Sequence, residues 1–198
     1  MRGFLMPRLF EHAAVHNVYG PAHRKAKYPK ADWAFLVQVA RNVAAAFDTI
    51  HAHGHVIGDV NQGNVLVGST ALVRLIDCDS FQIAAGNTQF PCEVGVPHFS
   101  APELLRAQSF RDVQRNVHHD NFALAVLMFH LLFMGRHPFA GVYCGAEDMP
   151  IERAIKEFRY AFGAQAAACQ MARPPGSVGP EIVSPSWRVC SSTLFAGT

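Results

Sequence analysis

Three side chains with oxygen atoms flank a short apolar hairpin in this sequence. Asp59 and Asn64 lie five residues apart in the stretch GDVNQGNVLV, and Asp77 ends the stretch VRLID. A carboxylate can orient an attacking hydroxyl group, and Mg²⁺ accepts carboxylate and amide oxygens as ligands. Gly58 and Gly63 allow the first stretch unusual backbone angles. The three residues are therefore the minimum set for moving a phosphoryl group from a Mg²⁺-bound nucleotide, provided that the fold brings them together.

Hydrophobic periodicity predicts the elements that position these residues. A helix is expected over 32–53, because apolar residues recur at helical spacing, Asp32 can cap its start and Gly54 can end it. Its predicted core-facing residues are Leu36, Val39, Ala40, Val43, Phe47 and Ile50. The other predicted elements are the end of a buried strand over 3–9, a short helix and loop over 11–30, short strands at 55–57, 65–67 and 73–76, a long functional loop over 79–100, and helices over 101–107, 120–134 and 151–162. The predicted fold class is α+β, mainly α-helical, with a short β-hairpin beside Asp59.

Composition narrows the class of protein. The chain has 198 residues, of which 50% are hydrophobic and 16% charged, so it is long enough for one domain with a sizeable core. The net charge of +2 argues against nucleic-acid or anionic-membrane partners. The apolar run 122–134 is too short to span a bilayer and contains His130, so we expect a buried helix. Five scattered cysteines without a CxxC motif, and no secretory signal, indicate reduced thiols in a cytoplasmic protein.

The histidines near the end of the first long helix suggest a metal site only superficially. His51, His53 and His55 alternate across a predicted helix end, so their rings should not face one point. We expect no zinc site there.

The order of several motifs resembles the C-terminal lobe of protein kinases. Asp59 precedes Asn64 by five residues, and Asp77 follows at the end of an apolar strand. The chain then carries Ala-Pro-Glu at 101–103 and Asp120 at the start of a buried helix. The wording around Asp59 and Asp77 is similar to a bacterial Ser/Thr kinase branch of that superfamily. The resemblance is firm over about residues 3–140 and looser beyond.

The resemblance implies a role for each matching residue. Asp59 would be the catalytic base that orients the substrate hydroxyl, with Asn61 beside it contacting phosphate. Asn64 and Asp77 would hold Mg²⁺. The implied adenine and hinge contacts are Leu66 beneath the base and the segment from Met6 to Leu9 beside it. Further along, 79–100 would be the activation loop with 95–99 facing the substrate, Glu103 would buttress that loop, and Asp120 would hold the catalytic-loop backbone.

Several residues depart from the family pattern, and they bear on how a kinase would be regulated and on whether the domain is complete. Ile57-Gly58 stands where the family has His-Arg, which removes the usual docking charge for a phosphorylated activation loop. Asn61 replaces the usual Lys, and Cys78-Asp79 replaces Phe-Gly. No Gly-rich loop and no strand Lys with a helix Glu partner occurs in the sequence. We therefore expect one partial kinase-like domain over 1–198 that begins at the hinge, with 173–198 loosely ordered or a truncated end.

The resemblance implies ATP and Mg²⁺ as cofactors and a protein substrate phosphorylated on Ser or Thr; it leaves the oligomeric state open. Two other functions stay open. Asn61, Val96 in place of a substrate-loop Thr, and the missing lid also favour a pseudokinase or binding module without catalysis. A small-molecule phosphotransferase of the aminoglycoside or choline kinase type shares the Gly-Asp loop, but the Ala-Pro-Glu motif with Asp120 favours a protein kinase.

Overall fold

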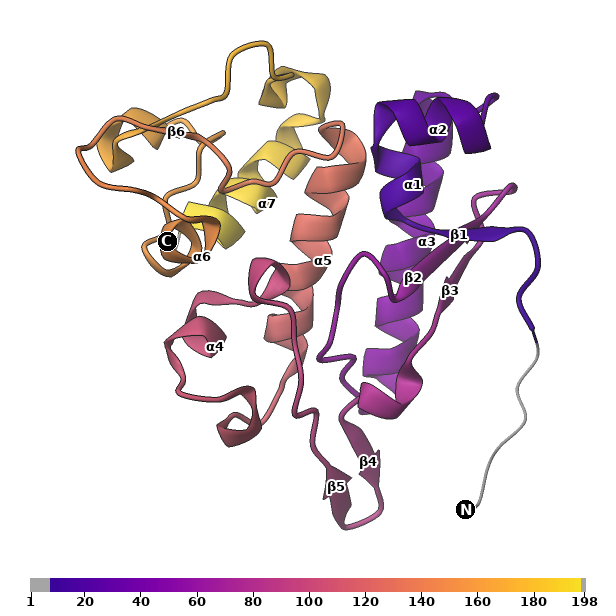
Figure 1. Ribbon diagram of the computed structural model, residues 1–198. Helices are drawn as coiled ribbons and strands as arrows, with labels where there is room; N and C mark the ends of the chain where they lie inside the picture. The colour runs from indigo at the N-terminus through magenta and orange to yellow at the C-terminus, as the bar shows by residue number, and fades with distance from the viewer. Residues whose placement is uncertain (1–7, 197–198) are drawn as a thin grey trace.

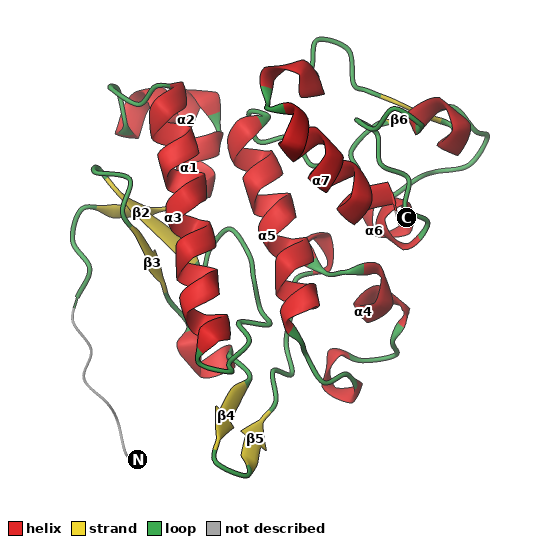
Figure 2. Cartoon of the chain, turned by 180° about the vertical axis from the view of Figure 1, so that it is seen from behind, coloured by secondary structure: helices red, strands yellow, loops and turns green. Residues whose placement is uncertain are grey.

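Helix α5 (Val117–Leu132) is the centre of the molecule in the computed structural model, which describes residues 8–196. Helix α3 (Trp33–Ala52) packs along one side of α5, and α7 (Pro185–Ala196) lies along the other (Figures 1 and 2). A helix that is apolar on most of its surface must be covered on most sides. The buried residues of α5 include Phe122, Val126, Leu127, Phe129 and Leu131.

Helix α3 forms as its sequence predicts. The Asp32 side chain accepts a hydrogen bond from the Phe35 N–H at 2.8 Å, which caps the first turn. The predicted core face is buried at Leu36, Val39, Ala40, Val43 and Phe47, and Ile50 packs against it partly buried. The prediction of a helix over 32–53 is confirmed to within a residue at each end.

A small antiparallel sheet covers the other side of α3. Strands β2 (Val65–Gly68) and β3 (Val73–Leu75) form the predicted hairpin, with Val65 opposite Leu75. Strand β1 (His12–Ala14) adds an unpredicted third strand, so the order is β1-β2-β3. The hairpin directs both of its ends toward the start of α5 (Figure 1).

Shorter elements complete the chain. The remaining helices and strands are α1 (His16–Tyr19), α2 (Pro21–Lys27), β4 (Ile83–Ala85), β5 (Thr88–Phe90), α4 (Pro102–Arg106), β6 (Val142–Tyr143), α6 (Ile151–Lys156) and β7 (Met171–Ala172). Strands β4 and β5 pair with each other, as do β6 and β7. Single 3₁₀ turns occur at Cys78–Ser80, Pro97–Phe99, Phe110–Asp112, Ala166–Cys169 and Pro180–Ile182.

Several predicted elements differ from the structure. The strand over 55–57 is a single bridge between Val56 and Gln82, and the loop over 79–100 contains the hairpin β4–β5. The helix over 120–134 begins at Val117, because Asn116 forms a capping box with His119.

Differences also occur toward both ends of the chain. The helix over 151–162 ends at Lys156, and Phe158 follows with a φ of 52°. A left-handed residue of this kind cannot continue a right-handed helix. Leu9 lies in no strand and is 38% exposed, against the buried strand expected over 3–9, and residues 1–7 lie outside the described part. The segment over 11–30, expected as one short helix and a loop, contains β1, α1 and α2.

Aromatic side chains join α7 to the core. The rings of Phe129 and Phe133 stack with centroids 4.0 Å apart, and Phe195 contacts Phe129 edge-on while being fully buried. The segment expected to be a loosely ordered or truncated end, 173–198, thus contains a helix that packs on α5. Among the described residues, no helix combines the length and apolarity needed to cross a bilayer.

Candidate active site

A buried carboxylate on α5 fixes the loop that carries Asp59. Asp120 is 1% exposed, and its Oδ2 accepts hydrogen bonds from the Ile57 N–H and from His51 Nε2, both at 2.8 Å. Its Oδ1 accepts from the Gly58 N–H at 2.9 Å. Charge-assisted bonds of this kind are the stronger ones in proteins. The predicted contact of Asp120 with the loop backbone is therefore present, one residue before Asp59.

Asp59 and Asn64 face each other across the loop. The Asn64 Nδ2 lies 3.1 Å from the Asp59 carbonyl oxygen and 3.3 Å from Asp59 Oδ2. Asn61 Nδ2 also donates to Asp59 Oδ2 at 3.3 Å, and Asn61 Oδ1 accepts from the Gly63 N–H at 2.8 Å. Asp59 Oδ1 is buried and has no hydrogen-bond partner among the described residues. One carboxylate oxygen of the predicted base is thus held by two amides, and the other is buried without a partner among the described residues.

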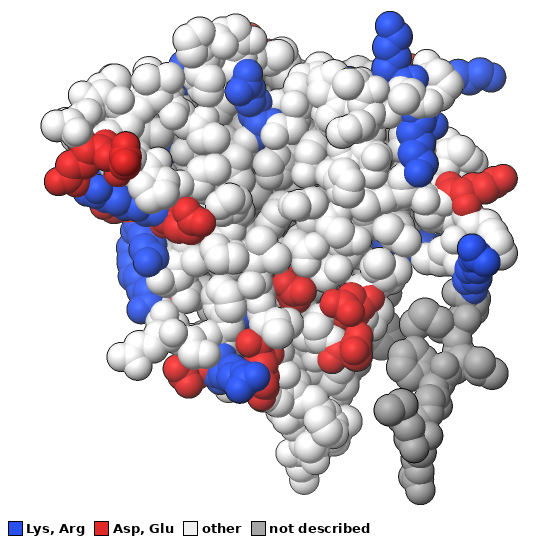
Figure 3. Space-filling model, viewed as in Figure 1, with Lys and Arg blue, Asp and Glu red and all other residues white. Residues whose placement is uncertain are grey.

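The hairpin brings Asp77 to the same place. The Ile76 N–H donates to the Asn64 carbonyl oxygen at 3.0 Å, so Asp77 follows directly beside Asn64. Asp77 has a φ of 62°, a left-handed conformation that a short polar side chain tolerates. Loss of hydration raises the pKa of the Asp77 carboxyl, and the negative charges of Asp79 and Asp59 raise it further. The three predicted residues therefore converge, and Figure 3 shows a group of acidic side chains near the middle of this face.

The donor set suits a hard cation such as Mg²⁺. Asn64 turns its Nδ2 toward Asp59, and no donor within residues 8–196 contacts its Oδ1. Repulsion among the carboxylates beside Asp77 is the kind that a divalent ion relieves. No group of three or more His, Cys, Asp or Glu in the described chain has metal-binding geometry, so the predicted ligands stand as one Asp and one Asn.

The three histidines at the end of α3 point to different partners. His51 donates to Asp120, His53 pairs with the Thr49 carbonyl, and His55 accepts from the Ala84 N–H at 3.3 Å. The three rings therefore have separate hydrogen-bond partners.

The structure describes only some of the residues that were predicted to contact the nucleotide. Leu66 lies in the middle of β2, half-buried, on the face opposite Val65 and Val67. Leu9 lies in the irregular segment before β1 and is exposed. Met6, the other predicted hinge residue, lies outside the described residues.

The segment beyond the β4–β5 hairpin is tied to the helices on this side. His98 forms an exposed ion pair with Glu152 of α6 at 3.0 Å. Glu103 of α4 lies 3.4 Å from Nε2 of the buried His119. The buried His119, placed by the capping box of α5, is the partner of Glu103. Burial lowers the pKa of His119, and the carboxylate of Glu103 opposes that shift.

Sequence reasoning missed the polar residues that hold the loop from behind. Gln82 and Arg115 are both buried and hydrogen-bonded to each other, and neither belongs to a recognisable motif. His51 did carry a signal, because it follows Phe47 by four residues and so continues the buried face of α3.

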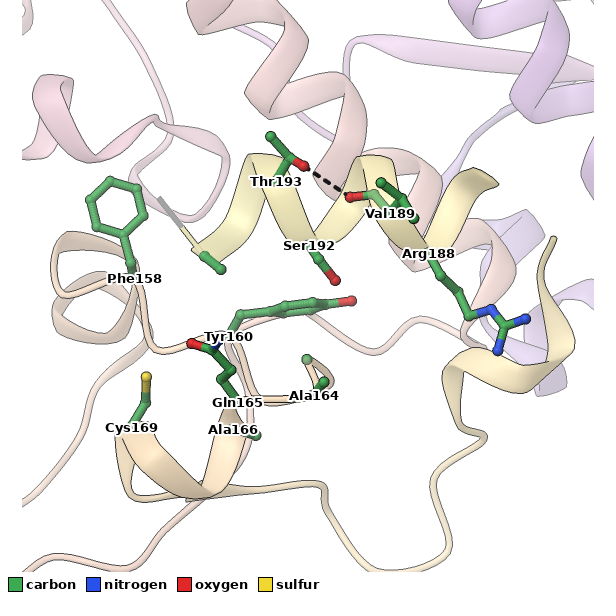
Figure 4. Close-up of a pocket in the computed structure, with 12 residues that line it drawn as sticks. Phe158, Tyr160, Ala164, Gln165, Ala166, Cys169, Arg188, Val189, Ser192 and Thr193 are labelled. Carbon is green, nitrogen blue, oxygen red and sulfur yellow. Dashed lines mark hydrogen bonds between the residues drawn. The ribbon is translucent and has the colours of Figure 1, made fainter. Parts of the chain in front are cut away.

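A separate cavity of about 410 Å³ lies between α7 and the segment 158–169 (Figure 4). Tyr160, Ser192 and Arg188 are among its lining residues, and none of the predicted site residues is. It therefore does not belong to the site around Asp59.

The arrangement of a buried acid on α5, the loop of Asp59 and the β2–β3 hairpin agrees with the result of comparison with known families. The protein kinase domain model matches residues 11–166, which is most of the chain. The chain therefore belongs to the protein kinase family.

Individual relatives are kinases of bacteria and of eukaryotes. The chain is 48% identical over 177 residues to protein kinase YegI of Escherichia coli, in both strain K12 and O157:H7. This match covers 89% of the chain but only 27% of each relative, so the chain spans about a quarter of their length. It is also 27% identical over 129 residues to a probable serine/threonine-protein kinase PknB of Lactococcus lactis, covering 62% of the chain and 18% of that protein.

Proposed function

We propose that this chain is the catalytic lobe of a kinase that transfers the γ-phosphoryl group of ATP to a Ser or Thr hydroxyl of a protein. The observation that carries the proposal is the convergence of Asp59, Asn64 and Asp77, with one oxygen of Asp59 left unpartnered. Membership in the protein kinase family supports the same reaction.

Asp59 is the proposed base. The amides of Asn61 and Asn64 orient its carboxylate by holding Oδ2 at 3.3 Å, and this carboxylate would accept a hydrogen bond from the acceptor hydroxyl. The hydroxyl oxygen forms the new bond to the γ-phosphorus while the bond to the ADP oxygen breaks. The hydroxyl proton passes to Asp59. Positioning of this kind accounts for most of the catalysis in phosphoryl transfer.

Asn64 and Asp77 would hold Mg²⁺ through the Asn64 Oδ1 and the Asp77 carboxylate. When bound, Mg²⁺ would supply the positive charge that neutralises the charge developing on the transferring phosphate. Leu66 offers an apolar surface on β2 for the adenine ring. Met6 and Leu9 are proposed to lie beside that ring.

A protein substrate is favoured by the segments that surround the base. The segment Gly95–Phe99 connects to α6 through the His98–Glu152 pair, and Glu103 connects to α5 through His119. These contacts fix the segment that follows the β4–β5 hairpin to helices α5 and α6. In the resemblance to protein kinases this segment faces the substrate, which is why a protein substrate is proposed.

The test is phosphoryl transfer from ATP to a Ser- and Thr-containing peptide library by the natural gene product that carries this chain. Asp59→Ala should reduce turnover about 10²–10⁴-fold, the usual contribution of a positioned base. Asp77→Ala should weaken Mg²⁺-dependent ATP binding. Asp48→Ala, an exposed acid on α3, is the matched control and should change neither. Unchanged turnover in Asp59→Ala contradicts the proposal.

A non-catalytic nucleotide-binding module is the second candidate. Asn61 stands where the family carries a lysine, and both ends of its amide are engaged within the loop, to Asp59 and to Gly63. That position therefore brings no cation to a transferring phosphate. Thermal stabilisation by Mg²⁺–ATP without any peptide phosphorylation would favour this candidate. Phosphorylation of an aminoglycoside or choline, but of no peptide, would favour the small-molecule alternative.

A further inference from the structure

A buried arginine outside the predicted site lies where three segments of the site meet. Arg115 is 2% exposed and precedes α5. Its Nη2 donates to the Val94 carbonyl oxygen at 2.8 Å, and its guanidinium carbon lies 4.8 Å from the centre of the Phe110 ring. A guanidinium over an aromatic face is a favourable contact. The Arg115 side chain thus holds the segment around Val94.

The backbone of Arg115 is fixed to the catalytic loop at the same time. The Arg115 N–H donates to Gln82 Oε1 at 2.9 Å, and Gln82 Nε2 donates to the Arg115 carbonyl oxygen at 2.8 Å. The Gln82 N–H and carbonyl both pair with Val56, at 2.8 and 3.0 Å. Val56 lies three residues before Asp59. Arg115 therefore connects the loop of the base, through its backbone, with segment 92–95, through its side chain.

The residue directly before the base leaves room for this arrangement. Gly58 has a φ of 73°, and a Cβ there would lie 2.5 Å from Cys92 Sγ and 3.5 Å from Arg115 Cγ. Cys92 is itself buried. A side chain at position 58 would clash with Cys92, whereas the stem of Arg115 lies at ordinary contact distance.

The charge of Arg115 is incompletely matched by hydrogen bonds. Among the described residues, Arg115 Nε and Nη1 are buried without hydrogen-bond partners. The same holds for Asp59 Oδ1. Burial lowers the pKa of Arg115, and the nearby Cys92, Asp120 and Asp59 act in the opposite direction. Arginine keeps its charge in proteins, so a cation remains beside the loop of the base. Unpaired buried donors are costly, which argues for a role beyond stability.

We propose that Arg115 is a positioning residue that holds segment 92–96 against the catalytic loop, in place of a cation directly before the base. The proposal rests on phosphoryl transfer at Asp59 and concerns how that site is regulated. Since the anchoring charge is internal, the segment is ordered without an added phosphate group. Gly58 and Arg115 then act together: Gly58 leaves the space next to the base free of a side chain, and Arg115 supplies the positive charge that anchors segment 92–96.

The test compares Arg115→Met, which keeps most of the volume and removes the charge, with Arg115→Lys. Arg111→Met is the matched control, because Arg111 also contacts this segment, through Glu93 at 3.3 Å, but is 72% exposed. Amide hydrogen exchange over 92–96 is measured on the folded chain, and KM and kcat are measured with ATP and one peptide from the Ser and Thr library.

Arg115→Met should speed exchange over 92–96 about 10–100-fold, the effect of losing a charged hydrogen bond. It should lower kcat/KM for the peptide by a similar factor and leave the Kd for Mg²⁺–ATP within about twofold, because the metal ligands lie outside the contact. Arg115→Lys should recover part of both effects through a bond to the Val94 oxygen. Arg111→Met should change neither.

Exchange over 92–96 that is equal in Arg115→Met and the unmodified chain overturns the proposal, as does an equal effect of Arg111→Met. If Arg115→Met does not fold, Gly95→Ala decides, since its Cβ would press on Arg115 Nη2 at 3.2 Å and on the Phe110 ring at 3.3 Å. Faster exchange over 92–96 in Gly95→Ala supports the proposal and unchanged exchange overturns it. Exchange needs no turnover, so a failure of the proposed phosphoryl transfer, seen in Asp59→Ala, is distinguishable from a failure here.

Discussion

Replacing Asp120 by asparagine should destabilise the chain and displace the catalytic loop. Asp120 accepts three hydrogen bonds, two on Oδ2 from Ile57 and His51 and one on Oδ1 from Gly58. Asparagine has one acceptor oxygen. If the asparagine oxygen keeps the two hydrogen bonds on the Oδ2 side, the amide N–H₂ must face the Gly58 N–H. The Gly58 N–H is then left without an acceptor in a buried place.

The magnitude follows from these contacts. Losing one charged hydrogen bond costs about 1.5–3 kcal/mol, and converting the other two to neutral bonds costs about 0.5–1 kcal/mol each. The sum is about 2.5–5 kcal/mol, which for a chain of this size lowers Tm by about 5–20 °C. Peptide phosphorylation should fall more than Mg²⁺–ATP affinity, because Gly58 adjoins the base and not the metal ligands.

Urea denaturation and thermal unfolding of the chain measure the stability change. Asp48→Asn, the exposed acid of α3, is the control and should stay within about 0.5 kcal/mol. His51→Ala removes only one of the three bonds, so it should cost less than Asp120→Asn. A loss below about 1 kcal/mol in Asp120→Asn would show that the loop is held by other contacts.

Three further outcomes follow from local geometry. Gly54→Ala, at a residue with a similar φ and open space around it, should cost only the left-handed strain of about 1–2 kcal/mol in urea denaturation. Gly58→Ala should cost well more than this, because its Cβ would also clash with Cys92. Equal losses in the two variants would refute the predicted clash. Burial lowers the pKa of His130 to about 4 and of His137 to about 3, so the unfolded chain binds more protons than the folded chain below pH 6.5. The free energy of unfolding should therefore fall by about 2 kcal/mol for each ring between pH 6.5 and pH 5. His137→Gln should show a flatter pH profile. Asp32→Ala removes the cap of α3 and should cost about 1 kcal/mol by urea denaturation.

The pH prediction has a clear structural basis at His137. Its Nε2 donates to the His98 carbonyl oxygen at 2.8 Å, and its Nδ1 accepts from the Phe139 N–H at 3.2 Å. The neutral ring is therefore fully paired, and a second proton on Nδ1 would meet a donor. A profile that is flat between pH 7 and pH 5 would contradict this reading.

The parts of the fold that depend on local signals could be predicted from the sequence. Helix α3 has a regular apolar face and an aspartate cap, and the β2–β3 hairpin joins two apolar runs across a turn. The early end of α6 had no comparable signal, since apolar residues continue to Phe162. Tyr160 and Phe162 are buried, but they reach the core from irregular backbone after Phe158 turns left-handed. Burial alone did not reveal the conformation of that stretch.

Some residues of the candidate site could likewise be predicted from the sequence, and others could not. Asp59, Asn64 and Asp77 were predictable because the motif spacing is local and the hairpin between them is short. Arg115 and Gln82 were not, because they meet across 33 residues and neither lies in a periodic pattern. A buried arginine with a polar sequence around it reads as a surface residue until its partners are known.

The position of the proposed base is determined mainly from outside its own loop. Asp120 holds the backbone at 57 and 58 through its side chain, and Gln82 holds it at 56 through its backbone, so three consecutive residues before Asp59 are fixed by groups that come later in the chain. Asp120 reaches the loop only because α5 packs against α3. Since the Asp120 contacts span more than 60 residues in sequence, Asp59 and Asn64 can take these positions only after the two helices have docked. Mutations in the α3–α5 interface should therefore affect phosphoryl transfer without touching any residue that contacts the nucleotide.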